Sequence, residues 1–153
     1  MDAIDRRILA CLQRDASLPV AEVAARAGLS TTPCWRRIQN LEKAGVIQRR
    51  VALLDPKKVN LGVTVFVRVK TSQHNLPWLE RFAKGVSEIE EVVEFYRMSG
   101  DIDYLLRVVV PDIDAYDAVY KRLIAVAELA DVSSNFAMET LKHTTVLPVR
   151  YAL

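Results

Sequence analysis

The sequence lacks the features of a membrane or secreted protein. It contains no run of about 18 apolar residues, the length that a helix needs to cross a bilayer. Its first residues, MDAIDRRILA, carry two aspartates and have no apolar centre of the kind found in signal peptides. The two cysteines, Cys11 and Cys34, fall in segments predicted to be helical, which argues against a disulfide framework and favours buried free thiols. We therefore expect a cytoplasmic protein.

Residues from which active sites and metal centres are built are also scarce. The chain has two histidines, His74 in a predicted loop and His143 late in the last extended segment. No metal-ligand spacing, nucleophile elbow or phosphate-binding glycine loop occurs. We therefore predict that the protein is not an enzyme and that it has no catalytic residues, no metal site and no cofactor.

Charge is small for the whole chain but unevenly distributed. The net charge of the 153 residues is +2, which by itself argues against a nucleic-acid partner. Residues 1–60 carry 11 lysines and arginines against 6 aspartates and glutamates, whereas residues 61–153 carry 10 against 13. A basic first part joined to an acidic second part indicates two small domains, of which only the first faces phosphate.

The first part has the pattern of a helix-turn-helix domain. Apolar residues at helical spacing predict helices over residues 2–14, 20–27 and 31 to about 44. Gly28 and Gly45 follow the second and third of these segments, at positions typical of a helix end. The second and third helices are separated only by GLS, a turn short enough for a helix-turn-helix.

The third predicted helix, which contains TTPCWRRIQN, divides into an apolar and a polar side. Cys34, Trp35, Ile38 and Leu41 recur on one side, and Ser30 or Thr32 can cap the helix. Such a polar surface is often merely solvated, but the short turn, the preceding helices and the arginines after it favour a DNA-reading role. Arginine and lysine suit phosphate and guanine, and asparagine and glutamine suit adenine. We therefore expect DNA contacts from Ser30, Thr31, Thr32, Arg36, Arg37, Gln39, Asn40, Lys43 and Arg49.

The segment after the third helix predicts a wing and a hinge. VIQRRVALLD favours two short strands, or one strand and a linker, with Gln48, Arg49 and Arg50 at the tip. Asp-Pro and glycine then punctuate DPKKVNLG, which is typical of a hinge. The expected division is a winged helix-turn-helix domain over 1–52, a linker over 53–61 and a second domain over 62–153.

The second domain alternates between strand and helix patterns. Valines at every second position predict a strand over 63–69, and helical spacing follows over 79–86. Two strands over 91–98 and 103–110, a helix over 113–127 and an extended segment over 132–144 complete the order β-α-β-β-α-β. The predicted fold class is α+β, a three-helix helix-turn-helix domain followed by a ferredoxin-like βαββαβ domain.

One strand of this domain predicts a dimer. Leu105, Leu106 and residues 108–110 are apolar on both faces of the strand, yet both helices of the fold cover the same face of the sheet. A second copy that packs sheet against sheet would cover the other face. The alternative is that a terminal segment such as LPVRYAL lies over it.

Two stretches together resemble the Lrp/AsnC, or feast/famine, family of transcriptional regulators. AIDRRILACLQRDASLPVAEVAARAGLSTTPCWRRIQNLEKAGVI resembles the amino-terminal half of the family. YRMSGDIDYLLRVVV, followed by DVSSNFAMETLKHTTVLP, resembles its second half. The resemblance implies double-stranded DNA and an amino-acid effector as partners, and dimers that assemble further, commonly into octamers. It also implies that the effector binds where dimers meet.

The resemblance places the effector around MSGDIDY and the last strand. A glycine there lets the backbone approach a ligand, an aspartate can accept from its ammonium group, and free amides can donate to its carboxylate. Gly-Asp-x-Asp is also the composition of a tight turn, so the local pattern alone leaves both readings open. The candidate effector residues are Met98, Gly100, Asp101, Asp103, Tyr104, Ser133, Ser134 and Phe136; the two aromatic residues are equally consistent with the core.

Among the branches of the family, the sequence looks closest to the cysteine-responsive one, through TTPCW, VALLDPKKVNLG, VKT, FYRMSGDIDYL and SSNFAMETLKHTTVLP. This resemblance points to L-cysteine as the effector, while no residue of the predicted site selects a thiol over leucine, methionine or alanine. The chain departs from the family where Pro-Gly-Val often precedes the last strand, since it has AELADV there. The predicted function is a sequence-specific DNA-binding regulator that responds to an amino acid, and the alternative is an architectural DNA-binding protein without an effector.

Overall fold

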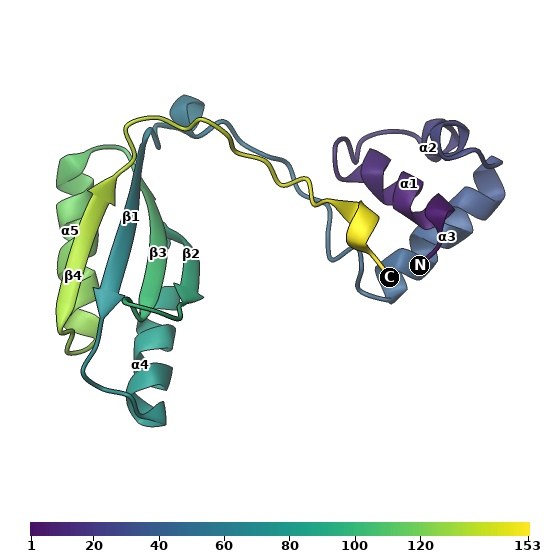
Figure 1. Ribbon diagram of the computed structural model, residues 1–153. Helices are drawn as coiled ribbons and strands as arrows, with labels where there is room; N and C mark the ends of the chain where they lie inside the picture. The colour runs from purple at the N-terminus through teal and green to yellow at the C-terminus, as the bar shows by residue number, and fades with distance from the viewer. The chain divides into compact units, whose positions relative to one another are not determined.

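The computed structural model describes all residues from 1 to 153, and the chain divides into two compact units (Figure 1). The first unit comprises Met1–Leu53 together with Leu141–Leu153, and the second comprises Leu54–Thr140. Each unit has its own core of buried apolar side chains. No helix in either unit has the length and apolar character required to span a bilayer.

The first unit contains the three helices predicted from the sequence. They are α1 (Ala3–Leu12), α2 (Val20–Ala27) and α3 (Thr31–Lys43). Asp2 caps α1 by accepting hydrogen bonds from the backbone N–H groups of Ile4 and Asp5, which satisfies two free amides of the first turn. Gly28 ends α2 with φ of +76°, a left-handed conformation that favours glycine.

The start of α3 differs in detail from the sequence prediction. Ser30 occupies the N-cap position with an extended backbone, but its side chain makes no capping hydrogen bond. Thr32 lies inside the first turn of the helix and is not the cap. The hydroxyl groups of both residues are therefore not used to close the helix.

The core of the first unit forms where the three helices meet. Ile8, Val23, Ala27 and Cys34 are completely buried, and Ile38 is nearly so. The thiols of Cys11 and Cys34 are free, and burial raises the pKa of the Cys34 thiol. Cys34 therefore behaves as a small apolar side chain of the core.

The wing predicted over VIQRRVALLD is absent, and this expectation was wrong. Backbone N–H groups of Val46 and Ile47 still bond to the Leu41 carbonyl, but residues 48–55 form no strand. A strand requires a neighbouring strand to take up its hydrogen bonds, and this segment has none. Within the expected hinge, Pro56–Val59 forms a short 3₁₀ helix. Asp55 caps it by accepting a hydrogen bond from the Lys57 N–H.

The carboxyl-terminal segment belongs to the first unit, whereas the sequence predicted residues 62–153 as one domain. Gln13 donates from Nε2 to the Leu147 carbonyl and accepts at Oε1 from the Leu147 N–H, both at 2.9 Å. The Arg6 guanidinium donates to the Ala152 carbonyl at 3.2 Å, and Val149 packs against the core of the helices. These contacts also exclude the alternative that LPVRYAL covers the sheet, and the extended segment expected over 132–144 is a strand only as far as Phe136.

The second unit has the predicted ferredoxin-like order. It consists of β1 (Val63–Lys70), α4 (Leu76–Ser87), β2 (Val92–Arg97), β3 (Tyr104–Val110), α5 (Ile113–Val126) and β4 (Asp131–Phe136). The strands form one antiparallel sheet in the order β2-β3-β1-β4. Both helices lie on one face of this sheet (Figure 1).

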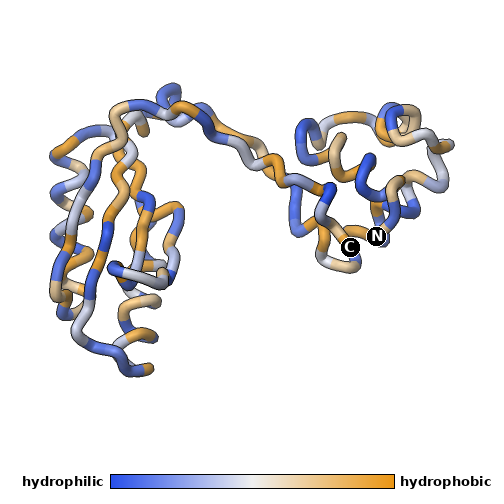
Figure 2. The backbone as a smooth tube through the Cα atoms, viewed as in Figure 1, coloured by the Kyte–Doolittle hydropathy of each residue, from blue (hydrophilic) through white to orange (hydrophobic).

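Alternation along β1 fixes which side chains enter the core. Val65, Val67 and Val69 are completely buried beneath the helices, while the residues between them point to the opposite face. Hydrophobic and hydrophilic residues alternate over the second half of this strand (Figure 2), whereas Phe66 in its first half is hydrophobic although it points to the opposite face. An aromatic group made of Trp78, Phe82, Phe95 and Tyr104 fills the same core, with ring centroids 4.8–6.0 Å apart.

The opposite face of the sheet is uncovered and partly apolar. Phe66 and Tyr96 are exposed on it, at 38% and 50%, and Leu105 is half-buried. Arg107 lies on the same face, 2.7 Å from the Glu94 carboxylate. The apolar residues on this face are consistent with the predicted sheet-to-sheet contact, and that contact would also include the Arg107–Glu94 ion pair.

Gly85 allows α4 and α5 to approach closely, and its replacement should be destabilising. A Cβ atom at this position would lie 2.4 Å from Cγ1 of Val126. We expect Gly85→Ala to lower the free energy of unfolding of the second unit by about 1–2 kcal/mol, because overpacking outweighs the better helix propensity of alanine. Denaturant unfolding followed by Trp78 fluorescence in a Trp35→Phe background measures the change. Gly62→Ala is the control, since nothing lies within 4 Å of its Cβ position; equal stability of the two variants would contradict the prediction.

Candidate DNA-binding face and effector site

The outer side of α3 presents polar residues to solvent. Cys34, Ile38 and Leu41 are buried and fix the inner side of the helix. The residues that are exposed outside this buried stripe include most of those predicted to contact DNA, namely Ser30, Thr31, Thr32, Arg36, Asn40 and Lys43. None of the side chains in this group makes a hydrogen bond or ion pair within the unit, so they are available to a partner.

Arg37 stands apart from this group because its guanidinium is already paired. Its Nη1 lies 2.7 Å from Oδ2 of Asp2 and 2.7 Å from Oδ1 of Asp5. Hydrogen bonds from Arg37 to Asp5 and Asp2 raise the pKa of its guanidinium. The pKa of Asp2 is lowered, first by the hydrogen bond from the Asp5 N–H and then by that from Arg37. Arg37 thus ties α3 to the first turn of α1.

Gln39 and Arg49, the remaining predicted DNA contacts, differ in their surroundings. Gln39 is half-buried and donates to Glu42 at 3.1 Å, and Glu42 also accepts from Arg50 at 3.0 Å. Arg49 is exposed on the segment that follows α3 and is not held in a wing. The position of Arg49 is therefore set by this irregular segment and not by a hairpin.

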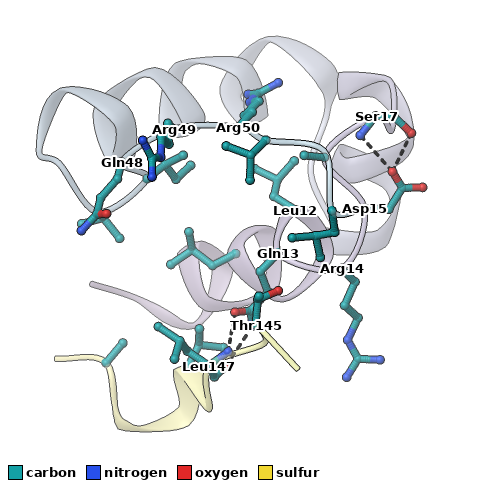
Figure 3. A pocket seen from close by; sticks show the side chains of 18 of the residues that line it. Leu12, Gln13, Arg14, Asp15, Ser17, Gln48, Arg49, Arg50, Thr145 and Leu147 are labelled. Atoms are coloured by element: carbon teal, nitrogen blue, oxygen red, sulfur yellow. Dashed lines mark hydrogen bonds between the residues drawn. The ribbon is translucent and has the colours of Figure 1, made fainter. Parts of the chain in front are cut away.

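The first unit also contains a cavity of about 920 Å³. It lies between the end of α1, residues 46–53 and residues 145–152, and Arg49 lines it (Figure 3). Dashed lines in Figure 3 show the two hydrogen bonds between Gln13 and Leu147 at one side of this space. Because the carboxyl-terminal segment forms one wall, the cavity depends on the return of this segment to α1.

In the second unit, the predicted effector loop is a tight connection between β2 and β3. The Met98 N–H donates to the Asp103 carbonyl at 2.8 Å, which closes the loop, and the Met98 side chain is partly exposed. Gly100 has φ of +111° and nothing within 4 Å of its Cβ position. The left-handed backbone conformation is therefore the reason for a glycine at this position, and the space beside it is open.

Two of the predicted effector residues have structural partners inside the unit. Asp103 accepts a hydrogen bond at Oδ2 from the Thr71 N–H, at 2.8 Å, and its own N–H bonds to the Val69 carbonyl. Tyr104 is only 5% exposed, lies in the aromatic core, and has its phenol pKa raised by burial. Both residues hold the loop against β1 and α4.

Asp101 and Ser133 share the uncovered face of the sheet. Asp101 accepts from Arg68 at 3.0 Å, and Arg68 is the register partner of Ser133 in β4. Arg68 was not among the residues predicted from the sequence, although its place between Val67 and Val69 in an alternating strand puts it on the polar face. The structure therefore brings together an anion, a cation and a hydroxyl-bearing residue.

Ser134 and Phe136 lie on the other face of the sheet, toward the helices. Ser134 hydrogen-bonds through Oγ to the Tyr116 hydroxyl, and the Phe136 ring packs edge-on against Tyr116 with centroids 5.3 Å apart. Burial raises the pKa of the Tyr116 hydroxyl. Asp101 and Ser133 thus lie on the open face, and Ser134 and Phe136 lie around Tyr116, so these four candidates do not form one site within a single subunit.

Each of the two units matches a known protein family model. Residues 1–42 match the model of the AsnC-type helix-turn-helix domain, and residues 64–147 match that of the Lrp/AsnC ligand binding domain. The chain belongs to the Lrp/AsnC family. It is therefore a transcriptional regulator with a DNA-binding and an amino-acid-binding domain, and the family is not one of enzymes.

Relatives and solved structures cover nearly the whole of this Lrp/AsnC chain. The glutamate uptake regulatory protein of Zymomonas mobilis is 50% identical over 97% of this chain and 91% of its own. The DNA-binding transcriptional activator DecR of Escherichia coli is 49% identical over 97% of this chain and 99% of its own. An AsnC family regulator from Agrobacterium tumefaciens, 66% identical, superposes over both full chains with a TM-score of 0.97. The regulator NMB0573 of Neisseria meningitidis, solved with L-Met, is 36% identical, with a TM-score of 0.94 over 100% of this chain and 99% of that one.

The two neighbouring arginines of α3 should respond differently to substitution. Arg36→Gln should weaken binding to a duplex about tenfold and reduce the slope of log affinity against log salt by about one, because a free cation that neutralises phosphate is lost. Arg37→Gln should leave this slope unchanged and lower the midpoint of thermal unfolding, because the contacts to Asp2 and Asp5 are lost. Fluorescence anisotropy at several salt concentrations and circular dichroism measure the two effects; a lower salt slope in Arg37→Gln would show a phosphate contact instead.

The pH dependence of the first unit follows from the same ion pairs. Because the pKa of Asp2 is held below its ordinary value of 3.8, its contribution to stability is present above that pH and is lost as the pH falls through the lowered value. In Arg37→Gln the pKa of Asp2 is lowered less, so this loss should be smaller and should be complete at a higher pH, which acid unfolding followed by circular dichroism detects.

Proposed function

We propose that this regulator reads DNA with the outer face of α3, and that L-cysteine controls its assembly and its binding to DNA. The observation that supports the DNA-reading part is the outer face itself. Thr32, Arg36, Asn40 and Lys43 are exposed there, while the inner side of the same helix is held in the core. A rigid helix with unpaired polar side chains matches the requirements of major-groove reading.

The second part of the proposal is a homodimer that pairs its sheets through their uncovered faces. Phe66, Tyr96 and Leu105 lie on that face and would be removed from water in such a contact. Dimers would present two α3 helices to successive major grooves about 10 bp apart, or a multiple of this, on an imperfect palindrome. Assembly of dimers into an octamer or a similar particle is part of the proposal.

The effector site proposed in the second unit lies around Gly100 and Asp101. Arg68 can pair with the carboxylate of a bound amino acid, and Asp101 can accept from its ammonium group. In the single subunit the two side chains are paired with each other at an exposed position, where an ion pair contributes little to stability, so a zwitterion can replace it at small cost. Because they lie on the face through which the sheets would pair, a bound amino acid would lie at the interface between the two subunits. Met98 and Ser133 are further candidates beside it, whereas the candidates Ser134 and Phe136 lie around Tyr116 on the other face of the sheet.

The identity of the effector rests on the resemblance of several segments to the cysteine-responsive branch. The printed names of relatives include glutamate and leucine, and one solved relative holds L-Met. Ligands of this class share the ammonium and carboxylate groups that Asp101 and Arg68 would bind. Selection among them depends on side-chain contacts beyond this pair.

A panel of amino acids tests the effector proposal. L-Cysteine, kept reduced, should raise the midpoint of thermal unfolding of the second unit more than equal millimolar concentrations of leucine, methionine or glutamate, because a ligand that binds the native state stabilises it by mass action. Asp101→Asn should raise at least tenfold the L-cysteine concentration that produces a given increase of the midpoint. Asp117→Asn, which alters a carboxylate paired with Lys121 on α5, is the matched control and should respond as the wild type does. Silence across the whole panel would favour an architectural DNA-binding protein.

Sedimentation tests the proposed dimer. Phe66→Asp should shift the protein toward monomers at micromolar concentration, because it would bury an unpaired carboxylate in the sheet-to-sheet contact. Ile113→Asp changes another exposed apolar residue, at the start of α5 and away from the uncovered face, and should sediment as the wild type does. A dimer that persists in Phe66→Asp would move the interface to another surface.

A further inference from the structure

Trp35 is a large aromatic residue that the core of the first unit does not take up. The apolar stripe read from the sequence included it, but the structure leaves it 50% exposed on α3. Trp78, the other tryptophan, is 3% exposed, stacks on Phe82 at 4.8 Å and donates from its indole N–H to the Glu128 carbonyl. Trp35 makes neither an aromatic contact nor a hydrogen bond.

The position of Trp35 on the helix puts its ring beside the DNA-reading residues. Successive residues of an α-helix are rotated by about 100°. Trp35 follows the buried Cys34, so it points to the flank of the helix, one position before the exposed Arg36. Thr31 and Gln39 lie one turn away on either side, on the same flank. Arg37, held against α1, occupies the opposite flank.

No ring contact or hydrogen bond within the first unit accounts for an aromatic residue at this flank. The other exposed residues of α3 are polar, apart from Pro33 in its first turn. Half of the Trp35 side chain remains in water, where an indole ring is unfavourable by comparison with a polar side chain. Large aromatic side chains are among the residues that contribute most when they are buried in a contact.

We propose that Trp35 determines specificity by packing its ring against the C5-methyl group of a thymine in the major groove. In the major groove every base pair presents hydrogen-bonding groups, but only a pair that contains thymine also presents an apolar methyl group. The cationic residues of α3 are attracted to phosphates, whereas the uncharged face of the indole ring is complementary to the apolar methyl group. This inference adds a specificity-determining contact to the proposed function, in which α3 reads DNA, and it rests on that function.

The test uses duplexes in which single methyl groups are removed. Duplexes that bind the wild type are first selected from a randomised pool, and each thymine is then replaced in turn by deoxyuridine, which lacks only the methyl group. At one thymine or more in each half-site the wild-type affinity should fall about fourfold, the value of one buried methyl-sized group. In Trp35→Ala the same replacement should have no effect. Arg36→Ala, the matched control on the next residue, should bind more weakly overall but keep the methyl effect.

A second measurement does not depend on the variant folding. Duplexes that carry 5-iodouracil at the sensitive thymine place a photoreactive iodine where the methyl group was. On irradiation of the wild-type complex, mass spectrometry should find the cross-link on Trp35. A cross-link confined to other residues would overturn the inference, whatever the stability of Trp35→Ala.

The remaining outcomes separate this inference from the function on which it rests. A wild type that binds no duplex at low salt would overturn the DNA-reading function and the inference with it. If the wild type binds but no deoxyuridine replacement matters, only the inference fails. It also fails if Trp35→Ala weakens binding to every duplex equally and keeps the methyl effect, since the ring would then contact the sugar-phosphate backbone.

Discussion

Burial of one side of α3 is the constraint on which the DNA-binding unit depends. Cys34, Ile38 and Leu41 lock this side against α1 and α2, and the 3.6-residue period then determines where every other side chain of the helix points. Arg36 and Arg37 are neighbours in sequence but serve different purposes for this reason. Arg36 extends into solvent, whereas Arg37 reaches the start of α1 and forms ion pairs with the carboxylates of Asp2 and Asp5.

Periodicity accounts for what could be predicted from the sequence. The alternation of β1 and the helical stripes of α1, α2 and α3 gave the elements and their order, because the period of apolar residues reflects a local backbone geometry. The wing was predicted wrongly because a strand exists only if a partner strand lies beside it, and the sequence does not show the partner. The return of residues 141–153 to α1 was missed for the same reason, since it depends on contacts such as that between Gln13 and Leu147.

Residue type alone was a poor guide to the roles of side chains. Asp101 and Asp103 are two positions apart in one loop, yet one accepts from an exposed arginine and the other from a backbone amide that holds the loop to β1. Trp35 was placed on the apolar side of α3 because of its residue type, and Arg68 was overlooked because it lies in a valine-rich strand. In each case the deciding information is which neighbour lies within hydrogen-bonding or packing distance, and distant segments supply that neighbour.

The discontinuity of the first unit affects how it can be made. Its chain leaves at Leu53 and re-enters at Leu141, so the sequence of the whole second unit lies between its two pieces. During synthesis the three helices emerge first but gain Leu147 and Val149 only after the sheet has been translated. A fragment cut after Leu53 would likewise expose the surface of α1 that this segment covers. The first unit is therefore completed only after the second unit has been translated, although all three of its helices are made before it.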